Sequence, residues 1–205
     1  MPVSEWYNCL MDPQVIINQF FIEDRQVQPN GRIKRSILLA LIEDLQFCIF
    51  LPKRWNSLKL TPTQDTERAK IMPTFAILSL FCSGVDLLAR VINKRQPPRG
   101  QNGDYFKDCS LLWFGLSQVE ADQLWLLRNS ISHNYSLNPN YIVIQFGHGR
   151  LIRQNGINWE FYLHAMYIDL ERAKTNIYNH LLGESEADKQ VTAAFLSNHG
   201  FFYTN

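Results

Sequence analysis

The sequence lacks most of the short patterns that would assign a function directly. It contains no glycine-rich phosphate-binding loop, no zinc-finger spacing and no His-Glu-x-x-His pair, which disfavours metal and dinucleotide chemistry, so we expect no metal and no cofactor. Its four cysteines lie far apart, at positions 9, 48, 82 and 109, with no Cys-x-x-Cys pair. We therefore expect free thiols in a reducing, cytoplasmic environment rather than a disulfide scaffold.

Long apolar runs and an excess of charge of one sign are also missing. Asp86 and Arg90 interrupt the most apolar stretch, so that no run of 18 apolar residues exists and no membrane span is expected. The first residues lack the basic flank and apolar core of a signal peptide. The formal net charge is +1, so RNA binding would have to depend on a local basic patch rather than on the field of the whole protein.

The remaining composition is that of a folded helical protein. The chain has 205 residues, of which 46% are hydrophobic and 13% aromatic, enough to build one core. Apolar residues recur at three- and four-residue steps over 33–49, 78–92 and 166–181, as on the buried face of a helix. We expect a single, mainly α domain (1–205) with an N-terminal extension (1–31), an antiparallel bundle of four to five helices (32–182), and a short helix with an aromatic tail (183–205).

Prolines and a glycine predict where the bundle helices end or pack closely. The first bundle helix is expected to end at Leu51-Pro52, because proline breaks the helical hydrogen-bond pattern. Thr63 is a candidate cap of the next helix, which Pro73 starts or kinks. Gly84 inside that helix costs roughly 1 kcal/mol relative to alanine, so we expect another helix to pack closely against it.

Three other segments are less regular. Residues 15–21 fit either a short helix or a strand. The β-branched and aromatic run 141–146 predicts a strand, and Asn155-Gly156 predicts a hairpin turn, so we expect a small β insertion over about 141–163 before the last bundle helix. The aromatic tail at 201–203 must dock either on the same chain or on a partner.

The stretch from Trp125 to Tyr135 combines an arginine, two asparagines, two serines and a histidine. Ser117-x-x-Glu120 ahead of it is the pattern of a capping box. Asn138-Pro139 beyond it stops a helix. We therefore expect a helix over about 118–135 that carries His133 in its final turn.

This helix is expected to separate a polar face from an apolar one. On an ideal helix with Arg128 at 0°, the polar side chains lie at roughly 40°, 100° and 140°; they are Ser132, Asn129 and His133. The apolar side chains fall in an arc of roughly 260° to 340°; they are Leu124, Leu127, Ile131 and Tyr135. Cations near a helix C-terminus can simply serve stability, but the amide, hydroxyl and imidazole beside Arg128 favour a functional site.

Four further charged residues are candidates for supporting roles. Asp86 is either a solvated surface acid or a partner that orients a cation such as Arg128. Lys94, Arg95 and Arg99 cluster in a loop predicted over 94–103. They are either solvated or form an arm that contacts RNA phosphates beside the site.

The motif Arg128-Asn129-x-x-x-His133-x-Tyr135, near the end of a late helix of an expected bundle, resembles the HEPN domain family. That family is marked by Arg, four to six residues, then His, commonly with a polar residue directly after the Arg. The form with Tyr two residues beyond His resembles the HepT-type toxins of bacterial toxin–antitoxin pairs. The resemblance covers roughly residues 32–182, and its specificity lies in these eight residues.

The resemblance implies a HEPN-like bundle that works as a metal-independent endoribonuclease. Arg128 would bind and stabilise the phosphate, His133 would act as acid and base, and Asn129 would orient the phosphate or the imidazole, with Ser132 beside them. HEPN ribonucleases are thought to act from a cleft between two copies of the bundle, so the resemblance also implies a two-fold homodimer. The competing reading is a catalytically silent HEPN module that binds a nucleotide, RNA or a partner protein.

The HepT-type form further implies a nucleotidyltransferase antitoxin as partner. In those toxins the motif tyrosine, here Tyr135, is modified by the partner, which silences the toxin. On the helical pattern alone Tyr135 is equally a core aromatic. The chain is longer than a typical HepT toxin and carries a β insertion that compact toxins lack, which bears more on the antitoxin partnership than on the fold.

Overall fold

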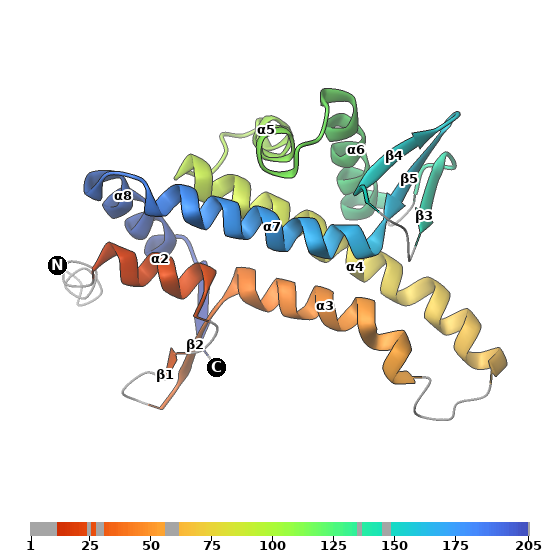
Figure 1. The fold of residues 1–205 in the computed structure, drawn as a ribbon, viewed down its shortest axis with the longest axis horizontal. Helices are drawn as coiled ribbons and strands as arrows, with labels where there is room; N and C mark the ends of the chain where they lie inside the picture. Colours follow the sequence, from red (N-terminus) through yellow and green to blue (C-terminus); the bar gives the residue numbers. More distant parts are fainter. Residues whose placement is uncertain are drawn as a thin grey trace.

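A computed structural model describes residues 12–23, 26–27, 31–55, 62–134, 137–144 and 149–204 of the chain. Helices dominate these residues, and short strands form two small sheets at opposite sides of the helical body (Figure 1). The predicted mainly α fold with a small β insertion is therefore confirmed.

Within the described part of 32–182, five helices form the bundle. They are α3 (Ile37–Trp55), α4 (Pro62–Asn93), α5 (Asn102–Phe114), α6 (Gln118–Asn134) and α7 (Leu163–Leu182). Helix α4 runs through the middle and contacts the other four (Figure 1). Its predicted apolar stripe is buried, as Leu78, Phe81 and Val85 show, and so is the stripe of α7. The core thus lies where the sequence periodicity placed it.

Gly84 marks the closest approach of α4 and α7. A Cβ atom at Gly84 would lie 2.8 Å from Cδ2 of Leu170, a side chain that is itself fully buried. The expected close packing of a second helix is confirmed, and it explains why a residue unfavourable for helices lies in the middle of α4.

Two predicted helix boundaries differ from the structure. Helix α3 does not end at Leu51 but continues through Pro52 to Trp55. Proline removes one backbone hydrogen bond, and a helix can continue past it. Helix α4 begins at Pro62, next to the predicted cap Thr63 and well before Pro73. A proline at the first helical position loses nothing, since the N–H there has no helical partner anyway.

The N-terminal segment α2 (Pro13–Phe21) is a helix rather than a strand. Asp12 caps it, its Oδ1 accepting a hydrogen bond from the Gln14 N–H at 2.9 Å. Ile16, Ile17 and Phe20 are buried, and α2 packs against α3, α7 and α8 (Glu186–Asn198). Residues 13–21, expected in an extension outside the bundle, thus contribute to the core.

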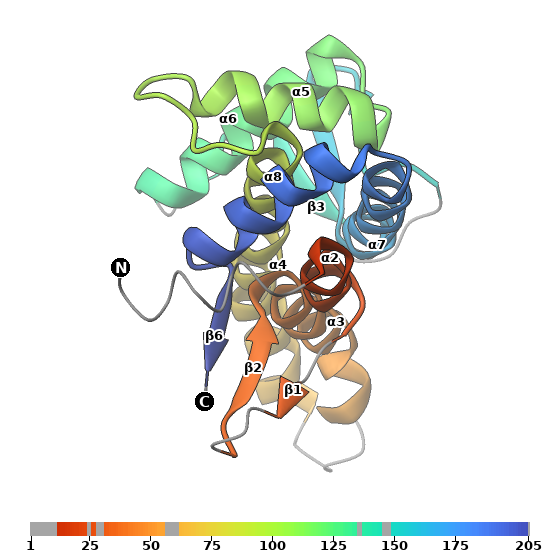
Figure 2. The same ribbon diagram turned by 90° about the vertical axis from the view of Figure 1, so that its left-hand side faces the viewer.

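The aromatic tail docks on its own chain. Strand β6 (Phe202–Thr204) pairs antiparallel with β2 (Ile33–Ser36), which also pairs with the short β1 (Gln26–Val27) (Figure 2). Phe201 is buried, and its ring lies 5.8 Å from that of Phe20. Of the two predicted alternatives, the structure thus has the one in which the tail docks on the same chain.

The β insertion consists of β3 (Tyr141–Ile144), β4 (Ile152–Asn155) and β5 (Asn158–Tyr162), in the order β3-β5-β4. Strands β4 and β5 form the predicted hairpin around Gly156, whose φ of 61° is the left-handed conformation that such a turn needs. Strand β3 pairs parallel to β5. Residues 145–146 of the predicted first strand lie outside the described residues.

One segment among the described residues, Thr74–Asn93 of α4, is long and apolar enough to cross a membrane by length and composition, with a mean hydropathy of 1.9. It includes the interrupting Asp86 and Arg90. Half of the segment is buried inside the protein, against the neighbouring bundle helices. A central bundle helix has this composition because it is surrounded by other helices.

Candidate functional site

Helix α6 carries the motif and begins where the capping box predicts. The backbone N–H and the hydroxyl of Ser117 both donate to Oε2 of Glu120 at 2.8 Å, and Ser117 Oγ accepts from the Glu120 N–H at 3.4 Å. The helix ends at Asn134, one residue before the predicted end. Leu124, Leu127 and Ile131 are buried, as the predicted apolar arc requires.

Arg128 is held by an acid on the central helix. Its Nε and Nη2 donate to Oδ2 of Asp86 at 3.1 and 3.0 Å, and its Nη1 donates to Oδ1 of Asn129 at 3.4 Å. The guanidinium carbon also lies 5.2 Å from the centre of the Trp125 ring, within the range of a cation–π contact. Asp86 is therefore not a solvated surface acid but the partner that orients Arg128, the second of its two predicted roles.

The Asp86–Arg128 pair is largely withdrawn from water. The Arg128 side chain is 21% exposed and that of Asp86 is 19% exposed. Burial raises the pKa of Asp86 above its ordinary value, and the neighbouring Arg128 and Arg90 lower it only in part. Asp86 therefore fixes the direction of the Arg128 guanidinium and balances much of its positive charge.

His133 lies in the last turn of α6 and is exposed, as is Ser132. No hydrogen bond or ion pair joins His133 to another residue that the structure describes. Val119, Leu126 and His133 follow one another at seven-residue steps, and all three are exposed. His133 thus faces outward along one line of α6 with no packing role that explains it.

Arg128 and His133 do not meet within one chain. On an ideal helix their side chains leave the axis about 140° apart. The structure keeps this divergence: Arg128 turns inward to Asp86, and His133 turns to solvent. Within the described residues the two side chains therefore point apart. Tyr135, the proposed modification site, lies outside those residues.

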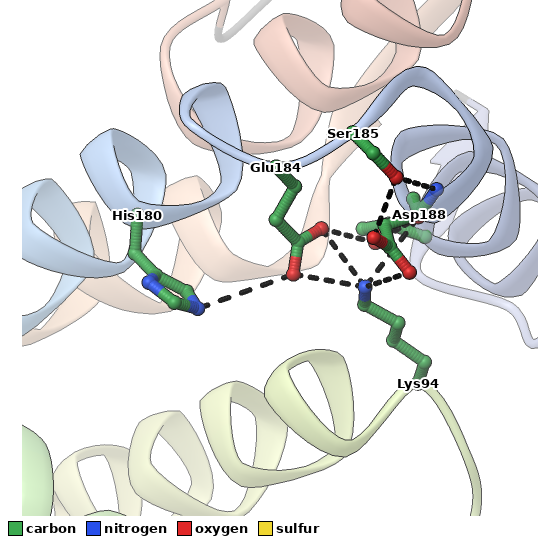
Figure 3. A network of polar contacts seen from close by, with 6 residues as sticks. Lys94, His180, Glu184, Ser185 and Asp188 are labelled. Carbon is green, nitrogen blue, oxygen red and sulfur yellow. Dashed lines mark hydrogen bonds and ion pairs between the residues drawn. The ribbon is translucent and has the colours of Figure 1, made fainter.

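The three basic candidates for RNA contact have different surroundings. Lys94 is tied to the protein: its Nζ donates to both carboxylate oxygens of Glu184 at 2.8 Å and lies 3.9 Å from Asp188 (Figure 3). It joins the end of α4 to the α7–α8 junction and is not available to a phosphate. Arg95 is exposed and lies over the ring of Tyr105, and Arg99 is exposed. These two remain the candidates.

A separate pocket of about 450 Å³ lies between the start of α6, the segment before β4 and α7. Its polar lining includes Glu120, Arg150, Asp169 and Arg172, none of which the sequence analysis proposed as a site residue. One signal was present: Asp169 lies between Met166 and Ala173, at a position of the apolar stripe of α7. An acid on a stripe that faces the core must be buried or must line a cavity.

Among the described residues, no three or more His, Cys, Asp or Glu side chains come together as a metal site would require. Cys82 and Cys109 are buried free thiols, whose pKa burial raises well above the ordinary value. They are therefore protonated and unreactive at neutral pH.

Comparisons with protein-family models, with curated proteins and with solved structures found no match. The resemblance to the HEPN family thus rests on the motif on α6 and on the mainly helical fold.

Proposed function

We propose that the protein is a metal-independent endoribonuclease of the HEPN type, active as a homodimer, with a role as a toxin or in defence. The best support for this proposal is the difference between the environments of the two motif residues His133 and Arg128. His133 is exposed and has no hydrogen-bond or ion-pair partner in the part of the chain that the structure describes, while Arg128, one turn and a half earlier, is held in a fixed direction by Asp86. Packing alone requires neither arrangement.

The chemistry needs groups of these types. The ribose 2′-oxygen attacks the adjacent phosphorus as the bond from phosphorus to the 5′-oxygen breaks, which leaves a 2′,3′-cyclic phosphate and a 5′-hydroxyl. One imidazole accepts the proton of the 2′-hydroxyl, and another donates a proton to the departing 5′-oxygen. Arginine stabilises the charge on the phosphorane, because its planar fork matches two phosphate oxygens.

A second copy of the chain is part of this proposal. One chain supplies a single motif histidine, whereas the reaction uses a base and an acid at the same time. Arg128 and His133 also diverge within one chain. A two-fold contact along the outer face of α6 would bring the histidines of two chains, and the Nη1 side of Arg128, to one groove. Asn129, hydrogen-bonded to that Nη1, would keep the fork in position. The exposed Ser132 lies one helical turn after Arg128.

Purified protein incubated with RNA in a metal chelator tests the proposal. We expect cleavage that yields cyclic phosphate ends, and a fall of about 10²–10⁴-fold in rate for His133→Ala, the usual contribution of a general acid or base. Arg128→Lys keeps the charge but removes the fork and should reduce the rate by at least about tenfold. His180→Ala, at another exposed histidine, is the matched control and should leave the rate unchanged. Equal activity in all four proteins would point to a contaminating nuclease.

The second candidate is a catalytically silent module that binds a nucleotide, RNA or a protein. It is favoured by the Asp86–Arg128 pair, because Asp86 balances the charge that a phosphorane needs, and by the net charge of +1. Chelator-resistant cleavage would exclude it. Absence of cleavage, together with RNA binding that Arg95→Gln and Arg99→Gln weaken, would favour it.

A nucleotidyltransferase partner that modifies Tyr135 stays a prediction from the motif. It is tested by incubating the protein with such an enzyme and labelled nucleoside triphosphate. Label transferred to the chain and lost in Tyr135→Phe would support it.

A further inference from the structure

Asp169 of α7 is a buried acid that the proposed nuclease chemistry does not use. Its side chain is 10% exposed, and burial raises its pKa above the ordinary value, which Arg172 offsets only in part. An ionised carboxylate can accept about four hydrogen bonds. Among the described residues Asp169 receives hydrogen bonds from Arg172 alone, and on Oδ1. Its second oxygen, Oδ2, therefore has no donor among the described residues and can accept hydrogen bonds from a molecule in the pocket.

Asp169 lines the pocket between α6, the segment before β4 and α7. A volume of about 450 Å³ falls in the range of pockets that hold small molecules. Two glycines of its wall, Gly115 and Gly149, have left-handed φ values of 66° and 106°, and a Cβ atom at either would meet nothing within 4 Å. The space beside these backbones is open.

The acidic and basic side chains of the pocket lie at different depths. The acids are its inner members, with side chains of Glu120 and Asp169 that are 16% and 10% exposed. The arginines lie at the mouth, with side chains of Arg150 and Arg172 that are 79% and 59% exposed. Glu120 is already satisfied by the N–H and hydroxyl of Ser117. Arg150 lies 3.7 Å from Oε1 of Glu120, and Arg172 pairs with Asp169. Asp169 is thus the inner acid that can accept further donors, and the two exposed arginines are the cations within reach of a ligand at the mouth.

We propose that this pocket binds a zwitterionic small molecule, an α-amino acid with an apolar side chain. Its ammonium group would donate to Asp169 in place of Arg172, and its carboxylate would pair with Arg172 and Arg150 at the mouth. Its side chain would lie against the apolar part of the lining, which includes Leu151 and Ile152. A polyamine would meet the two arginines at the mouth, and a phosphate would come close to two carboxylates, so a ligand that separates its charges fits best.

Calorimetric titration of the full chain with L-leucine and L-phenylalanine tests the proposal, beside leucinamide, N-acetyl-leucine, spermidine and inorganic phosphate. Leucinamide lacks the carboxylate, and N-acetyl-leucine lacks the ammonium group. We expect at least one amino acid to bind at least about tenfold more tightly than both derivatives, because each loses one charge-assisted contact. Asp169→Asn should weaken binding by at least about tenfold. Glu171→Gln, on the same helix but outside the pocket, is the matched control.

Arg172→Gln gives a second test in case Asp169→Asn does not fold. It should weaken binding of the amino acid while leaving leucinamide, which has no carboxylate, unaffected. Binding of phosphate alone, binding of spermidine in preference to amino acids, equal binding by Asp169→Asn or Arg172→Gln, or no binding of any of the six compounds would each overturn the proposal.

Discussion

At the scale of single residues, the direction of Arg128 depends on one partner far away in the sequence. Asp86 lies 42 positions before Arg128, and it decides that the guanidinium turns toward α4 instead of the solvent. His133 has no such partner among the described residues and is exposed. Asp169 is a buried acid whose one partner among the described residues, Arg172, is mostly exposed.

Removing only one member of the Asp86–Arg128 pair should destabilise the fold more than removing both. Asp86→Asn leaves the part-buried guanidinium without its counter-ion, and we expect the free energy of unfolding to fall by about 1–3 kcal/mol. The double variant Asp86→Leu/Arg128→Met should recover most of this loss, because two apolar groups need no counter-ion. Urea unfolding measures both. A double variant less stable than Asp86→Asn would contradict this account.

Asp169 predicts a pH dependence of stability. Because burial raises the pKa of this acid in the folded state, the folded state holds its proton to a higher pH than the unfolded state does. Stability therefore decreases as the pH rises from the ordinary pKa of 3.8 through the raised value. Asp169→Asn removes this titrating carboxyl group. The free energy of unfolding of the wild type, relative to that of the variant, should therefore decline from pH 4 to pH 7. A relative stability that rises over this range would show that the folded-state pKa is lowered instead.

At the scale of secondary-structure elements, close helix contact and helix capping fix where α6 and α7 sit around α4. Gly84 allows Leu170 to lie against the backbone of α4. The capping box starts α6 directly after the short turn from α5. These two local features set the position of the motif helix and of the pocket beside it.

Gly84→Val should therefore destabilise the protein by about 1–3 kcal/mol, the usual effect of overfilling a packed core. Leu170 would have to move, and it is fully buried. Ser79→Val, at an exposed position of the same helix, is the control and should change the stability by less than about 0.5 kcal/mol. Thermal unfolding compares the two, and equal stability of the two variants would mean that α4 and α7 are not packed as described.

At the scale of the whole molecule, the two ends of the chain close the fold together. Helix α2, near the N-terminus, packs on α8, and the tail strand β6 pairs with β2 (Figure 2).

Phe201→Ala should reduce the stability by about 3–5 kcal/mol, because it empties a buried aromatic site. Tyr203→Ala, at a half-buried position of β6, should cost clearly less. Docking of the tail on a second chain would instead make the melting temperature of the wild type rise with protein concentration. Such a rise, together with an unchanged melting temperature in Phe201→Ala, would contradict docking within one chain.

Helical periodicity was sufficient to predict most of the fold. The stripes of α4 and α7, the capping box at Ser117 and the hairpin at Gly156 depend on contacts a few residues apart. The parallel pairing of β3 with β5 and the salt bridges of Asp86 and Lys94 depend on contacts between distant segments, which no local pattern specifies. The polar face of α6 follows from helical spacing and was predicted correctly. The inward turn of Arg128 depends on the distant Asp86, so the sequence left open whether the two side chains pair.

The central claim is that two chains build one ribonuclease site, and mixing wild-type with variant subunits tests it most directly. Wild-type and His133→Ala chains are combined in equal amounts, allowed to exchange subunits and assayed on RNA in chelator. A mixed dimer contains only one of the two imidazoles that the proposed reaction uses. We expect exchange to lower the activity of the mixture to about half of its value before exchange, because about half of the wild-type chains are then in mixed dimers. An activity that exchange leaves unchanged, although mixed dimers are demonstrated and the wild type is active, would contradict the claim.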